Sequence, residues 1–118
     1  MILLRKKLFT QATKNLDKAR RAWAGDAVEL AQVHNALGYA LFNLEKVEEA
    51  VAQYREATGL QPGYVTAWNN AGDALERLKR YDEALEAYRQ ALSFDPDNKV
   101  AAGRADFCKT RLDRIQAR

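Results

Sequence analysis

The chain has few of the residues on which enzyme active sites, metal sites and disulfides are built. Its 118 residues include one cysteine, Cys108, and one histidine, His34, and Ser93 is its only serine. A single cysteine excludes an intrachain disulfide, and no Cys/His cluster has the spacing of a metal site. The sequence also lacks a glycine-rich phosphate loop. These absences argue against an enzyme, and we expect neither a cofactor nor a metal ion.

Proline and long apolar runs are scarce as well. The chain holds two prolines, and apolar runs such as Met1 to Leu4 are far too short to span a membrane. Hydrophobic residues make up 47% of the chain and charged residues 30%, which is typical of a globular rather than a disordered protein. Residues that favour helices dominate the remainder, so the composition predicts helical structure.

The net charge of +3 conceals a separation of charge along the chain. Residues 1–21 carry +6, residues 22–98 carry −7 and residues 99–118 carry +4. Basic ends raise nucleic acid as a partner, but the aromatic residues near the start, Phe9 and Trp23, are few and read as structural. We favour a solvated face, an acidic protein partner, or peripheral association with anionic lipid headgroups.

A repeat of 34 residues runs without a gap from residue 31 to residue 98. Each unit is predicted to hold two helices, at about 31–44 and 47–60 in the first and about 65–78 and 81–94 in the second. Pro62 and Pro96 stop the second helices, because proline lacks an N–H and restricts the residue before it.

Two glycines inside the first helices, Gly38 and Gly72, need a physical reason. A glycine within a helix costs about 1 kcal/mol relative to alanine. We predict that the missing side chain lets the paired helix approach closely, while Tyr54 and Tyr88 fill the wider gaps. A single helix pair cannot bury its own apolar face, so the units are expected to stack.

The motif Trp68-x-x-Ala71-Gly72-x-x-Leu75, followed by Ala84-x-x-x-Tyr88 and Pro96, resembles the tetratricopeptide repeat. The preceding unit has the same pattern with His34 in the tryptophan place, where we interpret it as a helix-packing imidazole. The resemblance implies an all-α helical-repeat solenoid of about six helices in antiparallel pairs, which acts as a non-enzymatic scaffold for other proteins. The residues of the repeat signature are Leu37, Gly38, Ala50, Tyr54, Ala57, Pro62, Trp68, Gly72, Ala84, Tyr88, Ala91 and Pro96.

We expect one domain over residues 1–118. It would comprise a partial first repeat at 1–30, full repeats at 31–64 and 65–98, and a capping helix at 99–118. Residues 8–22 align with the second helix of a repeat, so we expect the chain to begin within a repeat and to be a fragment of a longer protein. The capping helix is predicted to bury one apolar stripe, with its Arg and Asp residues outside: Ala101, Ala105, Cys108, Leu112 and Ile115.

In a tetratricopeptide stack, the first helix of each pair lines the concave face. The resemblance therefore implies a partner-binding face of Gln32, Asn35, Tyr39, Phe42, Asn43, Thr66, Asn69, Asp73, Glu76 and Arg77. The large apolar residues Tyr39 and Phe42 either anchor a partner or pack against the upstream helix or a neighbouring chain, and both interpretations stay open.

Some members of this family bind the acidic tails of chaperones through a clamp of Lys, Arg and Asn. Asn70 and Arg104 match two places of that clamp. Asn35, Tyr39 and Val100 stand where the clamp has Lys, Asn and Lys. Because both lysines are missing, we do not expect chaperone-tail binding.

A narrower resemblance lies in residues 29–38, 60–73 and 93–102. These stretches are similar to tetratricopeptide proteins of chloroplasts and cyanobacteria that assist photosystem I assembly, although Ala102 and Gly103 stand where that family has a more basic segment. The resemblance implies a thylakoid-associated assembly factor whose partners are photosystem I subunits or another assembly factor. The alternatives are a generic adaptor or co-chaperone in another pathway, and a nucleic-acid-associated scaffold.

Overall fold

A computed structural model of the chain describes residues 6, 7, 9–15 and 26–116, and the residues it describes form helices and turns without a strand. The predicted all-α fold is thereby confirmed. The chain divides into two compact units, Met1–Pro62 and Gly63–Arg118, called here the first and the second unit. The organisation of the whole chain as one domain stays a prediction.

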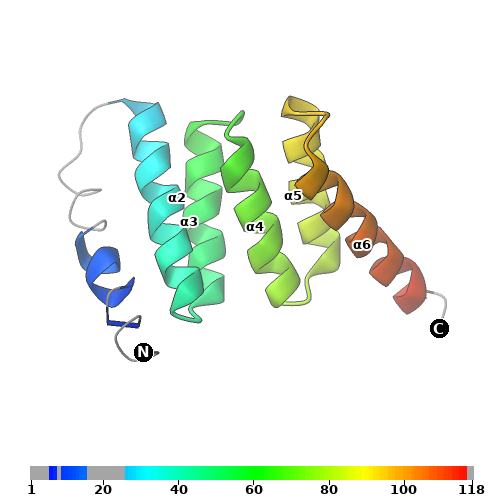
Figure 1. Cartoon of the computed structure of the whole chain (residues 1–118), viewed down its shortest axis with the longest axis horizontal. Helices are drawn as coiled ribbons and strands as arrows, with labels where there is room; N and C mark the ends of the chain where they lie inside the picture. Colours follow the sequence, from blue (N-terminus) through cyan, green and yellow to red (C-terminus); the bar gives the residue numbers. More distant parts are fainter. Residues whose placement is uncertain (1–5, 8, 16–25, 117–118) are drawn as a thin grey trace. The chain divides into compact units, whose positions relative to one another are not determined.

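The first unit contains α2 (Ala27–Asn43) and α3 (Val47–Leu60), preceded by helical residues at 9–15. The second unit contains α4 (Val65–Arg77), α5 (Tyr81–Phe94) and α6 (Lys99–Gln116) (Figure 1). The bounds of α3 and α5 agree with the prediction, and α4 ends one residue earlier than predicted. Of the partial repeat predicted over residues 1–30, residues 1–5, 8 and 16–25 lie outside the described residues.

Helix α2 begins at Ala27, four residues before the predicted start, because Asp26 caps it. The carboxylate of Asp26 accepts a hydrogen bond from the N–H of Val28 at 2.8 Å. A side-chain oxygen at this position satisfies one of the N–H groups that the first helical turn leaves unpaired. The helix therefore extends back to its cap rather than to the start of the 34-residue register.

Helices α2 and α4 end through the same backbone geometry. Glu45 and Lys79, which lie 34 residues apart, adopt left-handed φ angles of 64° and 61°. The next N–H groups reach back, from Lys46 to the Leu41 carbonyl and from Arg80 to the Leu75 carbonyl, each at 2.9 Å. This hydrogen-bond pattern closes a helix end and allows the following helix to start directly.

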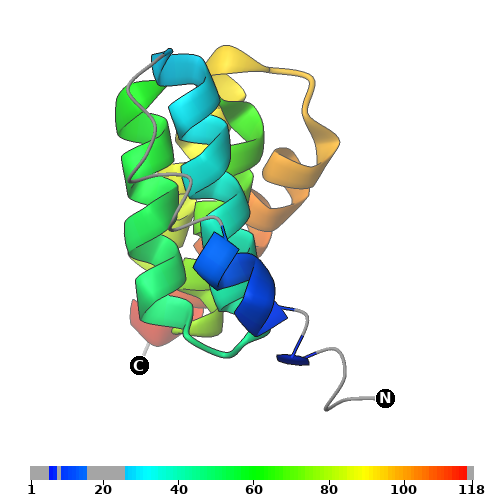
Figure 2. The ribbon, with the colours of Figure 1, turned by 90° about the vertical axis from the view of Figure 1, so that its left-hand side faces the viewer.

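In the first unit, α2 and α3 pack along one another (Figures 1 and 2). A Cβ atom added to Gly38 would lie 2.7 Å from a ring carbon of Tyr54, so the two helices meet as closely as predicted. His34 is buried beside this contact, and its Nδ1 lies 2.7 Å from the Gln53 amide oxygen. Because that oxygen only accepts, Nδ1 donates, and the imidazole packs between the helices as predicted.

In the second unit, α5 packs against α4 and α6. A Cβ atom added to Gly72 would lie 2.5 Å from Cζ of Tyr88, whose side chain is fully buried. The close approach predicted for Gly38 therefore recurs one repeat later, with a tyrosine of the second helix filling the space of the missing side chain.

Helix α6 departs from the predicted stripe in two ways. Ala101 and Cys108 are buried, whereas Ile115 is 58% exposed. The reason is length, because α6 has 18 residues and α5 has 14, so the last turn of α6 has less to cover it. Arg104, predicted to lie outside, is half-buried and turns toward α4.

Candidate functional site

The predicted binding residues of the first unit lie on one surface of α2, called here the α2 face. Its members follow helical spacing and lie opposite the buried Leu37 and Leu41: Gln32, Asn35, Tyr39 and the adjacent pair Phe42 and Asn43. Three of them are exposed, while Asn35 and Phe42 are half-buried. The structure thus brings the five residues to one helix surface, and their role in binding stays a prediction.

The surroundings of Tyr39 are compatible with both interpretations that the sequence left open, packing against an upstream helix and anchoring a partner. Its ring meets Phe9 edge-on, with 6.3 Å between ring centroids and 69° between ring planes. Phe9 belongs to the helical residues that precede α2, so upstream packing accounts for one side of the ring. Even so, 54% of Tyr39 remains exposed. An amphipathic aromatic ring held on one side and exposed on the other is suited to anchoring a partner.

The predicted binding residues of the second unit lie on α4 and form the α4 face: Thr66, Asn69, Asp73, Glu76 and Arg77. Asn69 has a structural role there. Its amide Nδ2 donates to Asn98 Oδ1 at 3.4 Å, and the same oxygen accepts the N–H of Ala101 at 2.9 Å, which caps α6. Asn69 Oδ1 is buried and has no hydrogen-bond partner in the described part of the chain.

Two carboxylates of the α4 face share one phenol. The hydroxyl of Tyr88, on α5, lies 2.6 Å from Asp73 Oδ1 and 2.5 Å from Glu76 Oε2. A phenol carries a single proton and can donate to only one acceptor at a time. The two contacts are therefore alternatives for one proton, which the phenol donates either to Asp73 or to Glu76.

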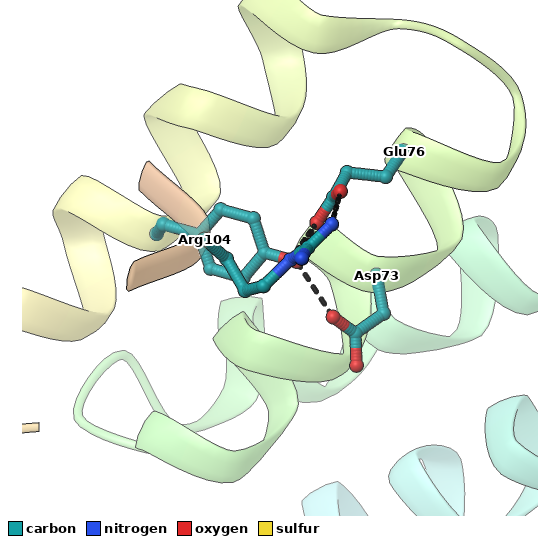
Figure 3. A network of polar contacts seen from close by, with 4 residues as sticks. Asp73, Glu76 and Arg104 are labelled. Atoms are coloured by element: carbon teal, nitrogen blue, oxygen red, sulfur yellow. Dashed lines mark hydrogen bonds and ion pairs between the residues drawn. The ribbon is translucent and has the colours of Figure 1, made fainter. Parts of the chain in front are cut away.

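Arg104 of α6 completes this network on the side of Glu76 (Figure 3). Its Nε donates to Glu76 Oε2 at 3.0 Å and its Nη2 donates to Glu76 Oε1, so the guanidinium and the carboxylate meet edge to edge. The guanidinium also lies 4.4 Å from the centroid of the Phe107 ring. A cation over an aromatic face is held by the ring quadrupole.

These residues line an open hollow of about 350 Å³, called here the α4–α6 hollow: Asp73, Glu76, Arg77, Tyr81, Arg104 and Phe107. Tyr81 and Phe107 meet edge-on with centroids 6.4 Å apart, and Arg111 lies over Tyr81. Sequence reasoning placed Asp73, Glu76 and Arg77 on a binding face but did not connect them with the other three. The resemblance of Arg104 to a clamp residue was the one available signal.

Protonation in this hollow follows from burial and from the shared hydrogen bonds. Burial raises the pKa of Asp73 above its usual 3.8; the bond from Tyr88 opposes the rise and nearby Glu76 adds to it. Burial, with hydrogen bonds to the two carboxylates, raises the pKa of Tyr88 far above 10, so the phenol keeps its proton. The hydrogen bond to Glu76 raises the pKa of Arg104, which stays charged.

The raised pKa of Asp73 yields a prediction for Asp73→Asn. Between pH 3.8 and the raised value, the folded chain holds a proton that the unfolded chain has released, so this carboxyl contributes less stability as pH rises. An asparagine amide donates to the phenol oxygen while the phenol donates to Glu76. We expect the variant to match the parent near pH 3.5 and exceed it at pH 7. The gain should stay below about 1 kcal/mol, because Asp73 is only partly desolvated and the residue as a whole is exposed, so solvent screens its charge.

The measurement is urea unfolding at a series of pH values. Asp106→Asn, which removes an exposed carboxylate from α6, serves as the control. A parent and an Asp73→Asn variant whose stabilities differ by the same amount at every pH would contradict the assigned cause.

Other reactive groups of the chain are enclosed or isolated. The Cys108 thiol is fully buried, in line with its predicted place on the apolar stripe of the capping helix, and burial raises its pKa to about 11, so it is protonated. Among the described residues, no three His, Cys, Asp or Glu side chains come together as a metal site requires. No helix in the described ranges has the length and apolar character needed to cross a bilayer.

Most basic residues of the two ends that the structure describes are exposed, and Arg104, which pairs with Glu76, is half-buried. Lys6, Lys7 and Lys14 line one open hollow with their polar neighbours on the first helical segment, and Lys109, Arg111 and Arg114 are exposed on α6. Solvated cations of this kind attract anionic surfaces at a distance, and salt screens the attraction.

Comparison with known proteins identifies the pattern of paired helices. A family model of the tetratricopeptide repeat matches residues 2–63 and 35–99. The Arabidopsis thaliana protein called tetratricopeptide repeat domain-containing protein PYG7, chloroplastic, is 48% identical over 111 residues, which cover 94% of this chain. The chain spans 37% of the length of that relative.

Solved structures with the same arrangement are tetratricopeptide domains. The domain of Arabidopsis OM64 matches with a TM-score of 0.78 and 24% identity, over 88% of this chain and 83% of that one. The second such domain of human RPAP3, in complex with the HSP70 peptide SGPTIEEVD, matches with a TM-score of 0.77 and 23% identity, over 86% and 81% of the two chains. At these identities the likeness shows the fold.

Proposed function

The chain belongs to the tetratricopeptide repeat family and is therefore a protein-interaction scaffold, and from this premise we propose that it assists photosystem I assembly at the thylakoid by holding a partner polypeptide. The 48% identity to a chloroplast protein of the family carries the proposal. The resemblance of residues 29–38, 60–73 and 93–102 to photosystem I assembly proteins supports it. The partner is a photosystem I subunit or another assembly factor.

The proposed action is physical rather than chemical. A half-assembled membrane complex exposes apolar surfaces that need temporary cover. On the α2 face, Tyr39 and Phe42 supply apolar anchors, and Asn35 presents an amide with a donor and an acceptor. On the α4 face, Asp73, Glu76 and Arg77 set the charge preference. Asn69 is committed in part to the cap of α6, which limits its contribution to the partner.

The basic ends have a supporting role in this proposal. Lys6, Lys7 and Lys14 at one end and Lys109 and Arg111 at the other are exposed, and each end carries a net positive charge. Near an anionic membrane surface, each basic residue gains about 1 kcal/mol. This attraction keeps the scaffold near an acidic partner or the membrane where the partner is inserted.

The variant that tests the proposal is Tyr39→Ala combined with Phe42→Ala. We expect unchanged helical content, because Tyr39 is more than half exposed and Phe42 lies on the same outer surface. Partner capture should weaken by on the order of 2 kcal/mol or more, about thirtyfold, if the rings are the anchors. The measurement is a pull-down from solubilised thylakoid extract, read by quantitative mass spectrometry.

Phe94→Ala is the matched control, because Phe94 is also an aromatic residue, is 50% exposed and lies outside the predicted face. Recovery of photosystem I subunits or assembly factors by the parent and by Phe94→Ala, with loss in the double variant, supports both the partner and the face. Equal recovery by all three overturns the face assignment. Recovery of chaperones alone favours the adaptor alternative.

A further inference from the structure

The guanidinium of Arg104 is already bound by a carboxylate of the second unit itself. Both nitrogens on its long edge, Nε and Nη2, donate to the carboxylate of Glu76. One of its faces is turned to the Phe107 ring at 4.4 Å. The edge that makes paired hydrogen bonds to a carboxylate is the most effective recognition surface of an arginine, and here Glu76 takes it.

Glu76 is held more firmly than Arg104. The Glu76 side chain is 10% exposed, whereas that of Arg104 is 43% exposed. The carboxylate also accepts a hydrogen bond from the buried Tyr88 hydroxyl at 2.5 Å. The carboxylate of Glu76 is thus fixed between Tyr88 of α5 and Arg104 of α6. It approaches Arg104 from the protein interior, whereas a ligand would approach from solvent.

An acidic ligand in the α4–α6 hollow meets two obstacles. To take the edge of Arg104, it has to displace Glu76 and leave that carboxylate buried without its cation, which is strongly unfavourable. To bind beside the pair, the acidic ligand has to approach the carboxylates of Glu76 and Asp73, which repel it. Arg104 does not offset this repulsion, because Glu76 already neutralises its charge. The hollow keeps its apolar walls, Tyr81 and Phe107, for other ligands.

We propose that Glu76 determines the specificity of the α4–α6 hollow by acting as an internal carboxylate ligand of Arg104. The hollow then rejects acidic peptide segments and accepts a segment that has no acidic side chain and packs on Phe107 and Tyr81. This inference rests on the proposed function, because it takes the hollow to be part of the partner surface.

The test compares peptide binding by the parent and by Glu76→Gln. The substitution keeps the side-chain shape and an acceptor for Tyr88, but it leaves the Arg104 charge unmatched. The probes are fluorescent SGPTIEEVD with a free C-terminus and the uncharged peptide SGPTIQQVN with an amidated C-terminus, titrated by anisotropy. We expect the acidic peptide to bind Glu76→Gln at least about tenfold more tightly than the parent, the equivalent of one charge-assisted hydrogen bond.

Adding Arg104→Gln to Glu76→Gln should abolish the gain, and the uncharged peptide should bind the parent and the Glu76→Gln variant alike. Glu76→Met provides a second route to an unmatched Arg104 if the glutamine variant melts early. Equal binding of the acidic peptide to the parent and to a folded Glu76 variant, or an equal gain for the uncharged peptide, overturns the inference. The thylakoid pull-down reads the proposed function separately, so a failure of either is distinguishable.

Discussion

Deletion of residues 99–118 is expected to lower the free energy of unfolding by several kcal/mol and to make the shortened chain aggregate. These residues include all of α6, which packs against α5 and touches α4. Its buried residues Ala101 and Cys108 mark the contact surface. Apolar burial contributes roughly 25 cal/mol per Å². Exposing a whole helix interface to water therefore removes several kcal/mol of stabilisation. A repeat array without its cap exposes an apolar face.

The loss of Arg104 adds an electrostatic cost to the deletion. Glu76 is 10% exposed and pairs with Arg104, so removing the guanidinium leaves a buried carboxylate without its cation. Breaking one side of a buried pair costs about 3–5 kcal/mol, and the exposure of Arg104 reduces that figure here. The carboxylate is expected to become exposed or to take up a proton, and either change loosens its contact with Tyr88.

The measurement is urea unfolding together with light scattering at several protein concentrations. Removal of residues 113–118 is the matched control, because the described side chains in that range are exposed. The short truncation should leave the unfolding midpoint nearly unchanged. If the long deletion stays monomeric and equally stable, α6 is a tail rather than a cap.

The sequence was most informative where one residue type meets one requirement of local geometry. Proline at Pro62 and Pro96 ends a helix, and the predicted bounds of α3 and α5 agree with the structure. Glycine at Gly38 and Gly72 predicts a close helix contact, because only a missing side chain justifies its cost. Each of these inferences needed one position and its immediate neighbours.

The sequence was less informative where helices far apart in the chain contribute to one site. Arg104 was predicted to be a solvated residue of α6, because charged side chains outside an apolar stripe usually are. Whether its long side chain turns to solvent or to Glu76, 28 residues earlier, depends on the angle between α4 and α6, which no periodicity encodes. The left-handed turns at Glu45 and Lys79 were missed because neither is a glycine.

Gly72→Leu is expected to destabilise the second unit by about 3 kcal/mol, with a fall in melting temperature on the order of 10 °C. A Cβ atom at this position lies 2.5 Å from Cζ of Tyr88, and the leucine branch adds further atoms in the same direction. The ring has no room to withdraw, because it is fully buried and its hydroxyl is held by Asp73 and Glu76. The cost therefore includes a broken hydrogen-bond network as well as overpacking.

The matched control is Gly103→Ala, because Gly103 also lies within a helix but an added Cβ atom there meets nothing within 4 Å. That variant should gain about 0.5–1 kcal/mol from alanine's higher helix propensity. Gly72→Ala should fall between the two, since its single added carbon already contacts the ring. Melting curves in which Gly72→Leu and the parent coincide would show that α4 and α5 separate at little cost. The small residue at this position would then need a different explanation.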